Sequence, residues 1–114
     1  MTSADSPDRI IVTVCTYNER ENLQTLIPAI RAQLPQATIL IVDDNSPDGT
    51  AEVVRSFNST DPQVQLLLRQ QKAGLGAATI AGFQAAMDRG AEFVINMDAD
   101  WSHPPELLPT LVRL

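Results

Sequence analysis

From Arg9 onward, short apolar runs alternate with longer segments in which apolar residues recur at helical intervals. The runs are rich in β-branched residues, which is typical of strands buried on both faces of a sheet. They predict strands over residues 10–15, 38–42, 64–68 and 93–97. Residues 1–8 show no periodicity and are expected to form a loose polar tail.

The segments between the predicted strands carry apolar stripes that predict helices. The first stripe ends at Pro35, because proline cannot continue a helix. A short helix is expected around residues 53–57, a longer one over residues 74–87, and a last one that opens at Pro104-Pro105. The residues expected on the inner faces are Leu23, Leu26, Ile27, Ile30 and Leu34, then Val53, Val54 and Phe57, then Leu75, Phe83 and Met87, and finally Leu107, Leu108 and Leu111.

Four strands that alternate with helices predict an open α/β fold with a parallel sheet and right-handed crossovers. In such sheets, ligands bind beyond the carboxyl ends of the strands, near the point where the strand order reverses. Three of the four predicted strands end in polar groups, at residues 16–19, 43–45 and 98–100. The sequence therefore predicts a binding site at this edge of the sheet.

Asp98 and Asp100 form the sharpest chemical signal in the chain. Side chains at positions i and i+2 of an extended segment point the same way, and two parallel carboxylates repel unless a proton or cation lies between them. Oxygen ligands suit Mg²⁺ or Mn²⁺, which keep positions open for water and substrate phosphates. An isolated pair of this kind is usually a solvated loop, but its place directly after an apolar strand favours a metal site.

Two segments begin like a calcium-binding loop and then depart from it. The segment from Asp98 has His103 where the sixth position needs glycine, and the segment from Asp44 has Arg55 where the twelfth needs glutamate. Residues 45–49 are good turn formers and predict a turn. Asp44 itself is expected to accept an N–H or O–H from the base or ribose of a nucleotide that lies across the strand ends.

Gly74-Leu75-Gly76 partly matches a dinucleotide-binding fingerprint. The third glycine position is Thr79, however, and residues 70–73 separate the strand from the first glycine, where the fingerprint needs a tight turn. We expect these small residues to let the helix pack closely on the sheet, with its N-terminus facing a phosphate. Lys72 is either a phosphate contact or a solvated lysine.

The bulk composition narrows the function further. The 114 residues suffice for one domain, and eight basic against fourteen acidic residues give a net charge of −6, which disfavours nucleic acid as a partner. Cys15 is the single cysteine, so no internal disulfide forms, and it is expected in the core. His103 lacks the second imidazole or thiol of a zinc set, and Trp101 is expected to pack under the site. The sequence contains no signal peptide and no apolar run of membrane-spanning length.

Several segments taken together resemble the family-2 glycosyltransferases of the GT-A fold and, among them, the dolichol-phosphate (polyprenol-phosphate) mannose synthases. The segments are TYNERENL at residues 16–23, VDDNSPDGT at 42–50 and MDAD at 97–100 followed by Ser102-His103, with KAGLG at 72–76 and AGF at 81–83. The resemblance spans residues 10–114, and ordered blocks at the right spacing are more specific than any one block.

The resemblance implies a role for individual residues. Those that it places at the nucleotide sugar are Cys15, Tyr17, Glu19, Val42, Asp44 and Ala99. Asp98 and Asp100 would be the catalytic residues that hold Mg²⁺ or Mn²⁺, with Ser102 as a weaker ligand. Because the family usually has proline where this chain has Cys15, the contact at that position is expected through the backbone.

The reaction implied by the resemblance is an inverting transfer of a hexose, mannose, from GDP-mannose to dolichyl or polyprenyl phosphate. A divalent cation would neutralise the diphosphate leaving group, and an acceptor phosphate that is already anionic needs no strong general base. The enzyme would be cytoplasmic and peripheral to the cytosolic face of a membrane. The acceptor-binding segments would lie beyond Leu114, so we expect residues 9–114 to be the N-terminal, nucleotide-binding half of a longer domain.

Other interpretations stay open at this point. One alternative is that the donor is another nucleotide sugar, such as UDP-glucose. A second alternative is that the chain is a truncated nucleotide-binding module without catalytic activity. A nucleotidyltransferase or an NAD-binding domain fits less well, because the glycine pattern is broken. A homo-oligomer is also open, since a second copy is one way to cover the edges of a sheet.

Overall fold

The computed structural model describes residues 9–70, 75–99 and 104–109. Strands and helices alternate along the chain as the apolar pattern predicts. The elements are β1 (Ile10–Thr16), α1 (Arg20–Gln33), β2 (Thr38–Asp43), α2 (Thr50–Asn58), β3 (Val64–Leu68), α3 (Leu75–Asp88), β4 (Phe93–Asp98) and the 3₁₀ turn η1 (Pro105–Leu107). Each strand matches its expected range, extended by at most one residue. Within these ranges no helix is long and apolar enough to cross a membrane.

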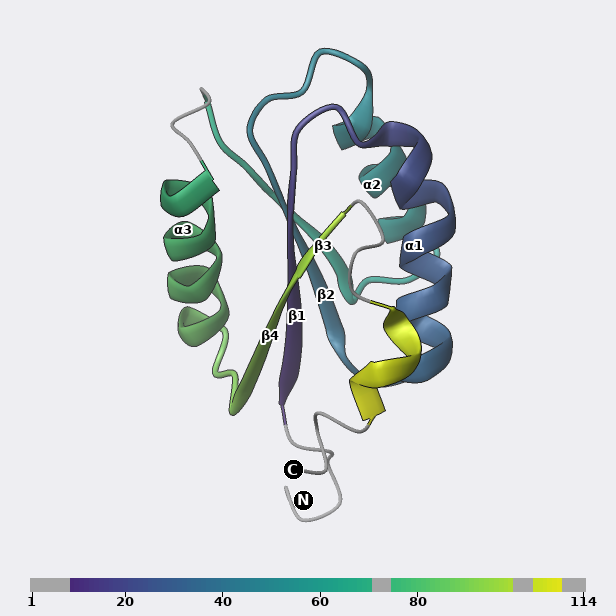
Figure 1. Cartoon of the computed structure of the whole chain (residues 1–114), viewed down its shortest axis with the longest axis vertical. Coiled ribbons are helices and arrows are strands. Elements are labelled where there is room, and N and C mark those ends of the chain that lie inside the picture. Colours follow the sequence, from purple (N-terminus) through teal and green to yellow (C-terminus); the bar gives the residue numbers. More distant parts are fainter. Residues whose placement is uncertain (1–8, 71–74, 100–103, 110–114) are drawn as a thin grey trace.

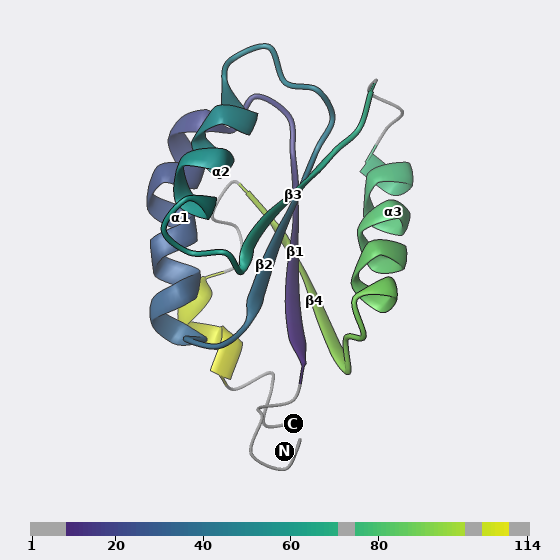
Figure 2. The ribbon, with the colours of Figure 1, turned by 180° about the vertical axis from the view of Figure 1, so that it is seen from behind.

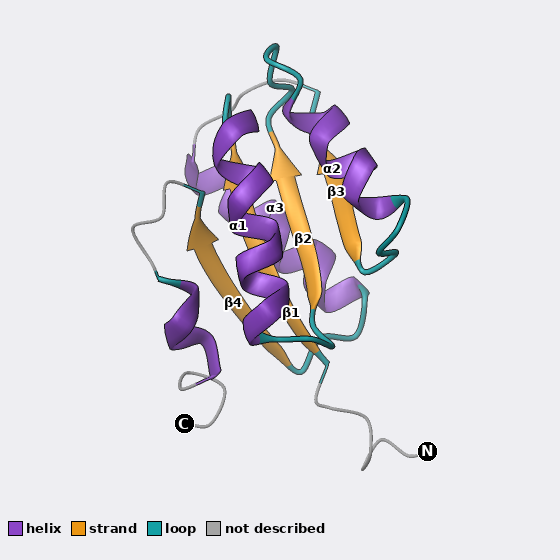
Figure 3. Ribbon diagram, turned by 90° about the vertical axis from the view of Figure 1, so that its right-hand side faces the viewer, coloured by secondary structure: helices purple, strands orange, loops and turns teal. Residues whose placement is uncertain are grey.

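The four strands form one parallel sheet in the order β3-β2-β1-β4. Helices α1 and α2, together with η1, cover one face of the sheet, and α3 covers the other (Figures 1 and 2). Figure 3 shows α1 and α2 in front of the strands and α3 behind them. This arrangement confirms the expected open α/β fold with helices on both faces. The strand order reverses beside β1, because β2 and β3 follow on one side of it and β4 lies on the other.

The larger hydrophobic core lies between the sheet and the two helices α1 and α2. The stripe predicted for α1 is confirmed, since Leu23, Leu26, Ile27 and Ile30 are all fully buried. They pack against β-branched residues of the central strands, namely Val12, Val14, Ile39 and Ile41. In α2, Val54 is buried, while Val53 and Phe57 pack against the edge of this core, as expected. The continuous apolar runs therefore supply the residues that the helices need to cover.

Arg31 fixes the end of α1 next to the predicted stop at Pro35. Its Nη1 donates hydrogen bonds to the carbonyl oxygens of Leu34 at 3.0 Å, Pro35 at 3.1 Å and Ala37 at 2.6 Å. Its Nε donates to Asp61 Oδ2 at 2.8 Å. All three carbonyl groups belong to residues between the end of α1 and the start of β2, so this side chain joins the helix to the loop that leads into the sheet.

Helix α3 packs on the sheet through small residues, so the inner face predicted for it is wrong. Phe83 and Met87 are 40% and 70% exposed, whereas Ala78 and Ala86 are buried. A Cβ at Gly82 would lie 3.2 Å from Val42 Cγ2, which shows how closely the helix backbone approaches the strands. Positions 78, 82 and 86 repeat every fourth residue and form the inner stripe, which leaves no room for large side chains. The side chain of Leu75 lies outside the described part.

The last described segment begins with the 3₁₀ turn η1, and Leu108 and Pro109 continue it in helical conformation up to the end of the described residues. Pro105 opens the turn in its first position, as expected. Leu108 is buried and joins the larger core, but Leu107 is 54% exposed, so its inward placement is wrong. A 3₁₀ turn has three residues per turn, so a stripe chosen for a 3.6-residue helix does not stay on one face. Leu111 lies outside the described residues.

Candidate functional site

The carboxyl end of β1 lies between those of β2 and β4, at the reversal of strand order. In the pairing register, Cys15 is opposite Val42 on β2 and opposite Asp98 on β4. Thr16 is opposite Asp43. Ligands of open α/β sheets bind at such a reversal. The register therefore brings the ends of all three strands with predicted polar groups to one edge of the sheet.

Asp43 organises the turn that follows β2. Its carboxylate is fully buried and accepts hydrogen bonds from Thr16 Oγ1 at 2.7 Å, from the Ser46 backbone N–H at 2.9 Å and from Ser46 Oγ at 2.6 Å. Asn45 and Gly49 have positive φ angles of 58° and 92°, a conformation that asparagine and glycine tolerate best. The turn predicted over residues 45–49 is thus confirmed, and Asp43 is occupied in holding it.

The loop after β1 is fastened to the loop after β2 by three backbone N–H groups. Asn18 donates to Ser46 Oγ at 2.8 Å, Glu19 donates to Thr50 Oγ1 at 3.2 Å, and Arg20 donates to Asp48 Oδ2 at 3.2 Å. These N–H groups precede or begin α1 and have no partner within the helix. Because the acceptors belong to the neighbouring strand end, the two loops hold one another in a fixed position.

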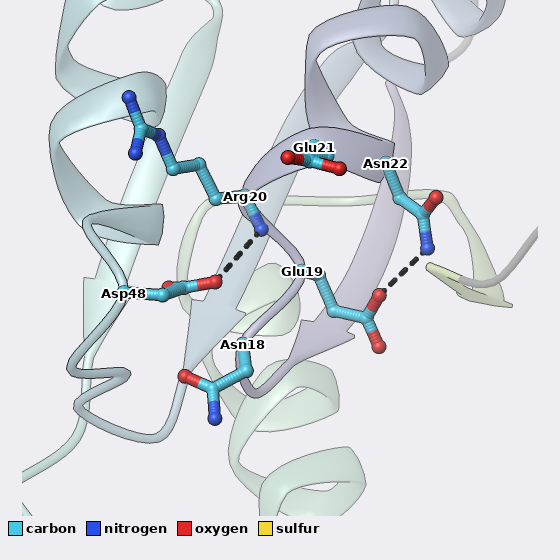
Figure 4. Close-up of a pocket in the computed structure, with 6 residues that line it drawn as sticks. All are labelled: Asn18, Glu19, Arg20, Glu21, Asn22 and Asp48. Carbon is cyan, nitrogen blue, oxygen red and sulfur yellow. Dashed lines mark hydrogen bonds between the residues drawn. The ribbon is translucent and has the colours of Figure 1, made fainter.

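A pocket opens where these two loops meet (Figure 4). The residues that line it are Asn18, Glu19, Arg20, Glu21, Asn22 and Asp48. Burial opposes the ionisation of Asp48, but hydrogen bonds from the Thr50 hydroxyl and from the backbone N–H groups of Arg20 and Thr50 outweigh it and lower the pKa of this carboxyl. Glu19, a predicted nucleotide contact, lies here, and its carboxylate accepts from Asn22 Nδ2 at 2.8 Å.

Tyr17 and Asp44 border the same strand ends. Tyr17 is 40% exposed. Asp44 is only 5% exposed, and its Oδ1 accepts from Arg69 Nη1 at 3.2 Å. The side chain expected to recognise a nucleoside is therefore held by an ion pair with the residue that follows β3.

Cys15 and Val42 present their side chains to the α3 side of the sheet. Val42 is fully buried beneath Gly82, and Cys15 Sγ lies 3.8 Å from Thr79 Oγ1. Burial raises the pKa of the Cys15 thiol, which a hydrogen bond with Thr79 partly offsets, so the thiol is neutral at neutral pH. Cys15 is partly buried and packs against the smaller core on this face of the sheet, as expected.

Asp98 is the last residue of β4 and is partly buried, and Ala99 follows it as a buried residue in a turn. Extended geometry therefore ends at Asp98, and the alternation from which parallel carboxylates were predicted does not continue through Ala99. Asp100 lies outside the described residues, as do Lys72, Gly74, Trp101, Ser102 and His103. Among the described residues no group of three or more His, Cys, Asp or Glu could hold a metal ion.

Sequence reasoning missed two residues that shape this edge. Asn96 Oδ1 accepts from Thr13 Oγ1 at 3.0 Å and lies 4.0 Å from Cys15 Sγ, so it fixes the alignment of β4 with β1. A polar residue inside an apolar strand is a signal that could have found it. Arg69 directly follows β3, so the rule that points to polar groups at the ends of the other three strands is the signal that could have found it.

Comparison with known proteins places this geometry among sugar-transferring enzymes. A family model described as "Glycosyl transferase family 2" matches residues 11–114. An undecaprenyl-phosphate mannosyltransferase of Micrococcus luteus is 43% identical over 105 residues, which cover 92% of this chain and 43% of that protein. A polyprenol monophosphomannose synthase of Mycolicibacterium smegmatis is 46% identical over 105 residues, which cover 91% of this chain and 40% of that protein.

A solved structure shows the same fold. The mannosyltransferase from Pyrobaculum calidifontis in complex with GDP-Man and Mn²⁺ matches 93% of this chain and 32% of its own, with a TM-score of 0.73 and 29% sequence identity. The chain thus spans less than half the length of the relatives that it matches.

Proposed function

Since the chain belongs to glycosyl transferase family 2, we propose that it forms the donor-binding part of an enzyme that transfers mannose from GDP-mannose to a polyprenyl phosphate. The names of the two bacterial relatives, a mannosyltransferase and a mannose synthase for polyprenyl phosphates, support both the sugar and the acceptor. The GDP-Man and Mn²⁺ in the Pyrobaculum enzyme support the donor and a divalent cation.

The observation that carries the proposal is the pairing of Asp98 with Cys15 at the reversal of strand order. A carboxylate at this point faces the region where a nucleotide would lie across the strand ends. Asp98 and Asp100 would hold the cation, and Ala99 between them would lie at the diphosphate. Carboxylate oxygens fit Mg²⁺ or Mn²⁺, and the remaining positions would be taken by water and the donor's phosphates. When bound, the cation supplies positive charge to the diphosphate leaving group.

The nucleoside would rest on the ends of β1 and β2. Asp44 would accept an N–H or O–H from the base or ribose, and Glu19 and Tyr17 would border it from the loop before α1. Val42 and Cys15 would contribute backbone groups, because their side chains face α3. The interlocked loops keep these groups in place before the ligand arrives, which lowers the entropy cost of binding.

The acceptor places few demands on the residues of this chain. A phosphate monoester carries negative charge at neutral pH, so it can attack the sugar without a strong general base. Attack on the side opposite the leaving diphosphate would invert the configuration of the sugar. A polyprenyl acceptor lies in a membrane, so the full-length enzyme would work at the cytosolic membrane surface.

The test is calorimetric titration of the full-length protein with GDP in the presence and absence of Mn²⁺, comparing Asp98→Asn with Asp88→Asn. Asp98→Asn is expected to weaken Mn²⁺-dependent binding of GDP by about 10- to 100-fold, because the cation loses a charged ligand. Asp88 is exposed at the end of α3, so the same substitution there should leave binding unchanged.

Two further measurements address the substrates. Incubation of GDP-[¹⁴C]mannose with polyprenyl phosphate should yield a radioactive lipid with the parent protein and not with Asp98→Asn. UDP should bind more weakly than GDP. Mn²⁺-independent binding of GDP, equal in both variants, would refute the assignment of the cation to Asp98. Binding of GDP without any transfer would refute the transferase and leave a nucleotide-binding module.

A further inference from the structure

Arg69 and Asp44 connect the ends of two neighbouring strands. Arg69 is the first residue after β3, and its backbone N–H donates to the Asp43 carbonyl at 2.8 Å, so its backbone continues the pairing with β2. Its side-chain Nη1 donates to Asp44 Oδ1 at 3.2 Å. The side chains of Arg69 and Asp44 are 20% and 6% exposed. The pair is therefore held at both the backbone and the side-chain level.

The ion pair occupies one of the two oxygens of Asp44. A carboxylate withdrawn from water is costly unless it is paired, and Arg69 is the partner that makes this burial tolerable. No described residue donates a hydrogen bond to the other oxygen, Oδ2. An ionised carboxylate has about four acceptor sites, so Oδ2 keeps its capacity to accept a hydrogen bond. Arg69 thus restricts the orientation of Asp44 without using all of its hydrogen-bonding capacity.

The charges at the strand ends act on a common point. Burial raises the pKa of the Cys15 thiol, the negative charges of Asp44 and Asp98 raise it further, and the positive charge of Arg69 lowers it. These three groups are therefore within electrostatic range of the tip of β1. Two carboxylates alone would repel an anionic ligand there, and the guanidinium reduces that repulsion. Arg69 is the described cation that acts at this point.

We propose that Arg69 is a positioning residue for nucleoside recognition: it holds Asp44 through Oδ1, so that Oδ2 accepts a hydrogen bond from the base or ribose of the bound nucleotide. This inference rests on the proposed function and goes beyond it by assigning the orientation of Asp44 to the end of β3. Arg69 acts through Asp44 and need not touch the ligand. The diphosphate end, at Asp98, does not depend on this ion pair.

The experiment separates the two ends of the ligand. Calorimetric titration of the full-length protein measures the Kd of GDP and the Kd of inorganic pyrophosphate, both with Mn²⁺. Arg69→Met is expected to weaken GDP binding by about 10-fold and to change pyrophosphate binding by less than about 2-fold. Asp44→Asn should cause a similar loss for GDP, and the double variant should lose no more than either single variant, because coupled residues are not additive. Arg69→Lys should recover part of the GDP affinity.

Arg55→Met is the matched control, because Arg55 forms an exposed pair with Glu52 on the outer side of α2. It should leave both dissociation constants unchanged. If Arg69→Met does not fold, the Kd of GDP and the Kd of pyrophosphate are compared in Arg69→Gln and Arg69→Lys instead. Equal weakening of GDP and pyrophosphate by the Arg69 variants would overturn the positioning role, as would loss of GDP binding in Asp44→Asn alone. The proposed function would instead be overturned if the parent protein bound pyrophosphate and bound no nucleoside diphosphate more tightly than pyrophosphate.

Discussion

Gly82 is the position where one added side chain tests how closely α3 approaches the sheet. A Cβ there would lie 3.2 Å from Val42 Cγ2 and 3.5 Å from Thr13 Cβ. Val42 and Thr13 are both fully buried in neighbouring strands, so neither has free space into which to move. Gly82→Leu gains about 0.8 kcal/mol of helix propensity but overpacks this contact at a cost of about 3 kcal/mol. We therefore expect the free energy of unfolding to fall by about 2 kcal/mol.

Urea unfolding of the purified protein measures this change, and for a domain of about 100 residues it corresponds to a Tm lowered by about 8–16 °C. Gly76→Leu is the matched control in the same helix, because no described atom lies within 4 Å of a Cβ at Gly76. That variant is expected to be as stable as the parent or up to about 0.8 kcal/mol more stable. Equal stability of the two leucine variants would refute the close approach of α3 to β1 and β2.

Two other predictions concern stability away from the ligand. Arg31→Met is expected to lower the free energy of unfolding by about 2–3 kcal/mol, because its charged hydrogen bonds join α1 to the loop that leads to β2. Arg55→Met, which breaks an exposed pair, should cost less than about 0.5 kcal/mol in the same urea assay, and similar losses would contradict this ranking. The pKa of Asp48 lies below its ordinary 3.8, so the stability it contributes is present above pH 3.8 and is lost as the pH falls through its folded-state pKa. As the pH falls from about 6 to about 3, the parent should lose more stability than Asp48→Asn, and identical pH dependence would contradict the hydrogen-bonded carboxylate.

The α3 error shows the limit of hydrophobic periodicity. Phe83 and Met87 are larger and more apolar than Ala78 and Ala86, so a stripe chosen by hydrophobicity points the helix the wrong way. Helix contacts are decided by the distance between backbones as well as by polarity, and that distance depends on the strands underneath. The small residues at the start of the helix pointed to a close contact, and the structure shows it at Gly82 and not at Gly76, where an added Cβ would meet no atom within 4 Å.

For the candidate site, too, the sequence predicted some features and only the structure revealed others. The strand-end rule predicted where polar groups would gather, and Asp98 indeed lies opposite Cys15 at the reversal of strand order. The separate parts played by Asp43 and Asp44 were not visible in the sequence, since both are aspartates at one strand end. Only the neighbouring strands distinguish them: Thr16 of β1 binds Asp43, and Arg69 after β3 binds Asp44.

By itself, the order of apolar runs and stripes determined the four strands, the helices between them and the edge of the sheet at which the candidate site is predicted. These features are local, because a segment buried on both faces or on one stripe must carry that pattern in its own residues. The tertiary structure alone decided the face that α3 presents, the partner of Asp44 and the register that sets Asp98 beside Cys15. Each of these is a contact between segments far apart in the chain, so its energy depends on how the two segments meet and not on either segment alone.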